Sequence, residues 1–71
     1  MKITYDKEID AMYLHFQKGV FARNKEVEKG IILDIGKGNI ILGIEILNAS
    51  KRIKPHNINY LNFQIPVGMP A

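Results

Sequence analysis

The sequence predicts a mainly β protein of the α+β class, a single small antiparallel meander sheet of five to six strands with one short helix near the C-terminal end. Apolar and polar residues alternate with a period of two along most of the chain, which is typical of half-buried strands. The stretch from Gly30 to Ser50 contains two aliphatic runs separated by a glycine-rich turn, the pattern of a β-hairpin. We therefore expect residues 1–65 to form one β-rich domain and residues 66–71 to form a flexible tail.

The alternation locates the first three strands in order. Residues 2–5 form the first strand, and residues 6–10 form a charged turn before a second strand at residues 11–16. Residues 17–20 contain a glycine and predict a tight turn. Residues 21–28 have the charged side chains of an edge strand, which discourage pairing with other chains.

The two aliphatic runs form the next two strands, and their register follows from the turn. If a two-residue turn or a four-residue loop centres on Lys37 and Gly38, Leu33 lies opposite Leu42. One face then forms the core, with Ile31, Leu33, Ile35, Ile40, Leu42, Ile44 and Ile46. The other face is mixed, with Ile32, Asp34, Ile41, Gly43, Glu45 and Leu47.

A short helix and a last strand complete the prediction. Asn48 is a suitable N-cap for a helix through about Ile53, and Pro55 should end it. Residues 60–65 alternate again and predict the final strand.

The mixed face of the hairpin indicates association with another chain. A chain of 71 residues without cysteine has a small core and no disulfide, so oligomerisation is the expected source of additional burial. Surfaces that mix apolar and charged side chains commonly mark interfaces. We expect a homo-oligomer, a dimer in the first instance, or a small protein partner, with Tyr13, Ile32, Ile41 and Leu47 as the candidate interface.

Asp34 and Glu45 are the carboxylates that could perform chemistry together. In the predicted register Glu45 lies four residues beyond the position opposite Asp34, a separation of about 13 Å. Carboxylates that share a scissile bond lie about 5 to 9.5 Å apart. We therefore predict a non-catalytic module with no catalytic residue, metal site or cofactor. The alternative is a small-ligand protein or enzyme with a polar pocket near Tyr13, His15, Asp34 and Glu45.

The charge distribution gives a weaker alternative. The net charge of +3 comes from basic residues spread along the chain, and their one cluster is Lys51, Arg52 and Lys54. These side chains could bind nucleic acid. We prefer the interpretation that they complement the C-terminal end of the short helix. We therefore do not expect nucleic acid as the partner.

The N-terminus does not resemble a signal peptide, and no apolar run approaches the roughly 20 residues of a membrane span. We therefore expect a cytoplasmic protein that does not bind a membrane.

Several motifs in order resemble a known family. YDKEIDAMYLHF, EVEKGIILDI and GIEILNASKRI are similar to the small prokaryotic family catalogued as domain of unknown function 2283. The matching elements are Tyr5 with Asp6, Asp10 to Tyr13, Gly30 to Asp34, Gly43 to Leu47, and Ala49 with Ser50. The resemblance covers approximately residues 1–53.

This resemblance implies a compact, mainly β protein of bacteria, archaea or phages without an assigned enzyme activity. It also implies that some relatives sit beside small toxin-like proteins, so an antitoxin role is an expectation at the level of the family. One turn and one further position depart from the family pattern. Gly36, Lys37 and Gly38 stand where relatives often have an acidic turn, and Asn48 stands where aspartate is common, so cation binding at that turn is not expected here.

Overall fold

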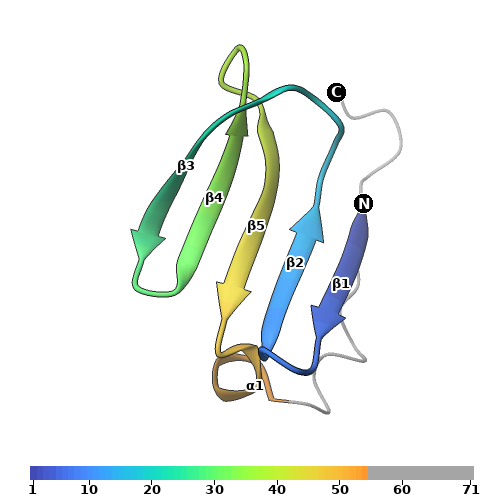
Figure 1. Cartoon of the computed structure of the whole chain (residues 1–71), viewed down its shortest axis with the longest axis vertical. Helices are drawn as coiled ribbons and strands as arrows, with labels where there is room; N and C mark the ends of the chain where they lie inside the picture. Colours follow the sequence, from blue (N-terminus) through green and yellow to red (C-terminus); the bar gives the residue numbers. More distant parts are fainter. Residues whose placement is uncertain (55–71) are drawn as a thin grey trace, which may run out of the picture.

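The computed structural model describes residues 1–54, which form an antiparallel sheet of five strands followed by a four-residue helix (Figure 1). The elements are β1 (Lys2–Asp6), β2 (Ala11–His15), β3 (Phe21–Glu28), β4 (Ile31–Gly36), β5 (Ile41–Leu47) and α1 (Ala49–Arg52). The predicted mainly β class and the short helix are therefore confirmed. The strand predicted at residues 60–65 and the tail predicted at residues 66–71 lie outside the described residues.

The strand order is β1-β2-β5-β4-β3, so the sheet is not the simple meander that the sequence predicted. Residues 17–20 do not form a tight turn between neighbouring strands. They belong to a connection that crosses the ends of β5 and β4 and enters β3 at the far edge, a Greek-key arrangement (Figure 1). The physical result is that the aliphatic strands β4 and β5 gain a neighbour on each side. The charged strand β3, whose residues are all exposed, is left at the edge as predicted.

The β4–β5 loop is one residue longer than a two-residue turn and one shorter than the four-residue alternative. Asn39 has a φ of 63° and follows Gly38 with a φ of 82°, so both residues belong to the loop. The N–H of Gly36 donates to the carbonyl of Ile40 at 2.7 Å, which closes the hairpin around three residues. Asparagine and glycine are the residues that adopt this left-handed conformation most readily.

A bulge then shifts the strands further. Asp34 pairs with Gly43, but Ile35 pairs with Ile41, so Leu42 is an extra residue on β5. The three-residue loop and the bulge together move β5 by two residues relative to the predicted register. Leu33 consequently lies opposite Ile44, and the predicted pairing of Leu33 with Leu42 was wrong.

The bulge also exchanges side chains between the faces. Ile41 shares a face with Ile35 because paired residues project to the same side. A Cβ atom at Gly36 would lie 3.0 Å from both Ile40 and Leu42, which places these two side chains beside Gly36 on the opposite face. The predicted positions of Ile40, Ile41 and Leu42 were therefore each on the wrong face.

The sheet has two faces of unlike character. The apolar face is defined by Ile3, Met12, Leu14, Ile31, Leu33, Ile35, Ile41, Ile44 and Ile46. The Asp34 face is defined by Thr4, Asp6, Ala11, Tyr13, His15, Ile32, Asp34, Gly43, Glu45 and Leu47. Among the described residues, the buried apolar side chains are those of Ala11, Met12, Ile35 and Ala49.

Asn48 occupies the N-cap position of α1 as predicted, but Asp10 accepts the hydrogen bonds at the start of the helix. Asn48 has a φ of 52° and its side chain makes no capping hydrogen bond. The carbonyl of Asp10 instead accepts the N–H of Ala49 at 3.0 Å. Lys51 and Arg52 lie in the last turn, as predicted. Within the described residues no helix is long and apolar enough to span a membrane.

Candidate functional site

The Asp34 face is organised around a hydrogen bond between two strands that do not pair with each other. The phenolic hydroxyl of Tyr13 on β2 donates to Oδ2 of Asp34 on β4 at 2.6 Å. The strand β5 lies between them, so the Tyr13 ring crosses over that strand. Both side chains are half-buried. This bond ties one half of the sheet to the other.

Gly43 leaves the space that the Tyr13 ring occupies. A Cβ atom at this position would lie 2.5 Å from the Tyr13 hydroxyl and 2.6 Å from its Cε1. It would also lie 2.5 Å from the carbonyl oxygen of Leu14. No side chain fits there without displacing β2, so glycine is required by the close approach of the two strands.

The observed register brings the two candidate carboxylates together. Tyr13 lies opposite Glu45, and Asp34 lies opposite Gly43, which is two residues from Glu45 on the same strand. Diagonal neighbours of this kind have Cα atoms about 7–8 Å apart. The predicted separation of 13 Å was therefore wrong, because it rested on the incorrect hairpin register.

The chemistry of the cluster is set by the state of the phenol. Burial raises the pKa of Tyr13 to about 12, with further contributions from its hydrogen bond to Asp34 and from the negative charges of Asp34 and Glu45. The phenol is therefore protonated at neutral pH and acts as a donor to Asp34. In this arrangement Tyr13 connects β2 to β4, and its protonated hydroxyl cannot act as a base at neutral pH.

His15 extends the cluster along β2. Its ring lies against the Tyr13 ring with centroids 4.2 Å apart and an interplanar angle of 58°. Nε2 lies 3.5 Å from the hydroxyl oxygen of Thr4, and the side chain is exposed. The four predicted pocket residues Tyr13, His15, Asp34 and Glu45 thus lie on one face. Within residues 1–54 no three histidine, aspartate or glutamate side chains gather closely enough to hold a metal ion.

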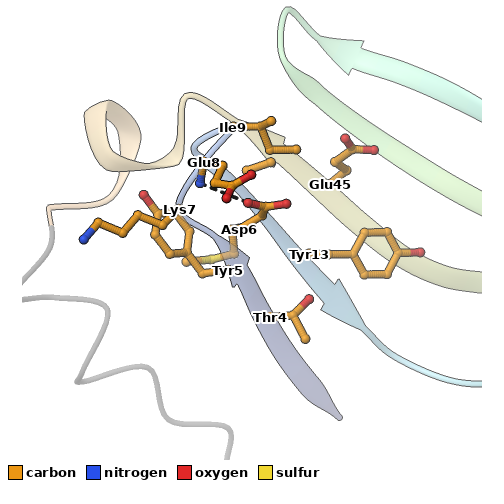
Figure 2. Close-up of a pocket in the computed structure, with 10 residues that line it drawn as sticks. Thr4, Tyr5, Asp6, Lys7, Glu8, Ile9, Tyr13 and Glu45 are labelled. Carbon is orange, nitrogen blue, oxygen red and sulfur yellow. Dashed lines mark hydrogen bonds between the residues drawn. The ribbon is translucent and has the colours of Figure 1, made fainter.

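A shallow pocket of about 740 Å³ adjoins the cluster beside the β1–β2 turn. Figure 2 shows Thr4, Asp6, Tyr13 and Glu45 on one side of the strands, with Ile9 at the rim and Lys7 pointing away. The remaining lining residues are Tyr5, Glu8, Ala11 and Met12. Thr4 and Asp6 were not predicted from the sequence. Pairing the first two strands across their turn would have placed Thr4 opposite Tyr13 and Asp6 opposite Ala11.

The other candidate residues are distributed over the molecule. Tyr13, Ile32 and Leu47 lie on the Asp34 face, whereas Ile41 lies on the apolar face. These four predicted interface residues therefore do not form one patch. The three nucleic-acid candidates lie around the end of α1. Lys51 and Lys54 are exposed, and Nη2 of Arg52 donates to the carbonyl of Lys29.

A second hydrogen-bonded cluster forms around Asp10. Its carboxylate accepts the Tyr5 hydroxyl at 2.7 Å, the N–H of Ser50 at 3.0 Å and the hydroxyl of Ser50 at 2.7 Å. The Tyr5 hydrogen bond and then the two bonds from Ser50 lower the pKa of the Asp10 carboxyl, and the same bond to Asp10 raises the pKa of Tyr5. Asp10 thereby joins the β1–β2 turn to the start of α1.

Replacing Asp10 with asparagine should destabilise the protein at neutral pH but not in acid. The pKa of Asp10 is lowered in the folded protein. The Asp10 carboxylate therefore stabilises the fold above the ordinary aspartate pKa, and this stabilisation is lost as the pH falls through the folded pKa. Asparagine tolerates the positive φ of 52° at this position. Melting temperatures of the parent and Asp10→Asn proteins should differ at pH 7 and converge in acid. An equal difference at both pH values would contradict this role.

Comparison with known proteins adds a family to this description. The chain is 35% identical over 71 residues to a Methanosarcina mazei protein named "Putative hypoxanthine phosphoribosyltransferase". The alignment covers 93% of this chain but only 57% of that relative, so the chain spans little more than half of its length. No solved structure matches the chain. The model of the family described as "Protein of unknown function (DUF2283)" matches residues 2–50, and the chain belongs to this family.

Proposed function

We propose that this chain is a non-catalytic binding module that acts by self-association, or by binding a small protein partner, through the apolar face of its sheet. One observation carries the proposal. The described residues form a single layer, and the only helix among them has four residues. A sheet with one hydrophobic face must bury that face against another element to be stable.

The burial of the apolar face supports this proposal. Met12 and Ile35 are buried, but the other members of this face are only half-buried. They are aliphatic residues from four neighbouring strands, namely Ile3, Leu14, Ile31, Leu33, Ile41, Ile44 and Ile46. A partner that covered them would remove apolar surface from water at about 25 cal/mol per Å².

The Asp34 face is less suited to dry association. Its centre is occupied by the Tyr13–Asp34 hydrogen bond, and Glu45 and Asp6 stand beside it. Covering these carboxylates without new partners would cost free energy. Tyr13, Ile32 and Leu47, part of the interface proposed from sequence, would therefore remain accessible.

Two substitutions on β4 separate the faces. Leu33 and Ile32 are adjacent, half-buried and on opposite faces. Leu33→Lys should shift the assembly to monomer by placing a charge within the apolar interface, whereas Ile32→Lys should leave the assembly intact. Sedimentation equilibrium gives the mass, and far-UV circular dichroism shows whether each variant is folded.

The opposite pattern, dissociation by Ile32→Lys alone, would assign the interface to the Asp34 face. If Leu33→Lys unfolds the protein, the parent protein still provides a test. A folding unit coupled to association melts at a higher temperature as protein concentration rises. A melting temperature independent of concentration would contradict self-association.

A second candidate is small-ligand binding on the Asp34 face. The register favours it by bringing Tyr13, His15, Asp34 and Glu45 onto one face, where Tyr13 and Glu45 line a pocket. Hypoxanthine is a reasonable first probe, since it appears in the name of the Methanosarcina mazei relative. This candidate predicts a rise in melting temperature with hypoxanthine that Glu45→Gln abolishes. No shift with the parent protein would count against hypoxanthine as the ligand.

We also propose that the protein is cytoplasmic. If the chain acts as an antitoxin, its partner is a small toxin-like protein. Co-expression with small proteins encoded beside it tests that version. A partner that co-purifies with Ile32→Lys but not with Leu33→Lys would support binding through the apolar face.

A further inference from the structure

The apolar face changes character at the β3 edge. Across β2, β5 and β4 it is aliphatic, but β3 contributes charged residues to the same side. Arg23 pairs with Ile35, Lys25 with Leu33 and Glu28 with Ile31, so these three charged residues share the apolar face. All three are exposed.

The charges on the two sides of Leu33 have opposite sign. Arg23 is level with Ile35, two residues to one side of Leu33, and Glu28 is level with Ile31, two residues to the other side. The bulge between Glu26 and Glu28 is what brings Glu28 to that level. Four residues of strand separate the two levels, about 13 Å, so Arg23 and Glu28 do not pair within one chain.

This order fits a two-fold axis. If two sheets face each other about an axis that crosses the strands at the level of Leu33, every strand lies over its own copy in the reverse direction. The level of Ile35 then lies over the level of Ile31, and Arg23 faces Glu28 of the second copy, twice by symmetry. Aliphatic strands lie over aliphatic strands. An axis parallel to the strands would instead place the β3 charges over β1, where Ile3 projects.

We propose that the partner of the apolar face is a second copy of this chain, packed face to face about such an axis, with Arg23 and Glu28 pairing reciprocally at the rim. This inference rests on the proposed function and specifies its partner. Aligned sheets of this kind enclose a shared core about 10 Å thick. Lys25 of both copies lies at the axis level on the exposed edge, where its long stem lets the ammonium turn into water.

The existing contacts of Arg23 are compatible with this pairing. One N–H of its guanidinium donates to Oδ1 of Asn39 at 3.2 Å, which leaves other N–H groups free to reach a carboxylate. The side chain thereby contacts the loop that joins β4 and β5.

A charge exchange tests the arrangement. Arg23→Glu and Glu28→Arg should each weaken the dimer about tenfold, because both symmetry-related contacts then oppose like charges. The double variant Arg23→Glu/Glu28→Arg restores opposite charges and should return the dissociation constant to near the parent value. Sedimentation equilibrium measures all four proteins. The matched control is Glu26→Arg on the same strand, which lies opposite Ile32 on the other face and should leave the dissociation constant unchanged.

The outcomes separate the two claims. Rescue by the double variant supports the arrangement. The weaker dimer of Arg23→Glu could not then be due to loss of the Arg23–Asn39 bond, because the double variant lacks that bond too. A dimer in which the double variant is no tighter than the single variants would overturn the arrangement but not self-association. A monomeric parent protein would overturn both.

Discussion

Replacing Met12 with alanine should destabilise the protein by about 2–4 kcal/mol, the cost of removing a buried long side chain and leaving a cavity. Met12 is fully buried on the apolar face, and it lies between Tyr5 on β1 and Ile46 on β5. A domain of this size has a total stability of only about 5 kcal/mol. Urea denaturation at fixed protein concentration measures the change.

Met12→Leu is the matched control for this substitution. Leucine nearly conserves the volume, so the expected cost is below about 1.5 kcal/mol. If alanine and leucine cost the same, Met12 does not fill a packed site, and the assignment of the core to this face is wrong.

Replacing Gly43 with alanine should destabilise the protein by about 2 kcal/mol, although alanine is a small change on an ordinary strand. The new Cβ would lie 2.5 Å from the carbonyl oxygen of Leu14 and from the Tyr13 hydroxyl. The Tyr13 ring can move, but the carbonyl is fixed by strand pairing, so β2 and β5 must separate. Urea denaturation gives the cost, and a value near zero would mean that Tyr13 does not cross over Gly43.

Tyr13→Phe isolates the hydroxyl from the ring at the same site. The folded pKa of Tyr13 is about 12, above the ordinary value of 10. The contribution of the Tyr13 hydroxyl to the free energy of unfolding is therefore fully present below pH 10 and is lost as the pH rises toward 12. The parent protein should therefore be more stable than Tyr13→Phe at neutral pH, and this advantage should shrink between pH 10 and 12. A constant difference across that range would exclude the Tyr13–Asp34 bond as its source.

Period-two alternation was sufficient to predict the strands and the charged edge. The observed bounds of β1, β2 and β3 lie within one residue of the predicted ones. In β2 the alternation follows from one side of the strand facing the apolar neighbours Ile44 and Ile46. The exposed β3 likewise follows from its charged residues alone.

Register and strand order were not predictable from the same alternation. A positive φ at Asn39 and an extra residue at Leu42 each moved the register by one residue without altering the pattern of residue types. Those two residues decide whether Asp34 and Glu45 are 13 Å apart or close neighbours. The pairing of β2 with β5 is a long-range contact, which no local signal specifies.

The residues that carry the family resemblance have structural roles in this chain. Asp10 and Ser50 join the β1–β2 turn to α1, and Tyr13 and Asp34 join β2 to β4 across β5. Gly43 makes room for that second contact.

The most direct test of self-association through the apolar face is the mass of the unmodified protein by sedimentation equilibrium over a range of concentrations. We expect a dimer with twice the 8.1 kDa mass of one chain, in exchange with monomer at the lowest concentrations. A folded species of 8.1 kDa at every concentration would contradict the account.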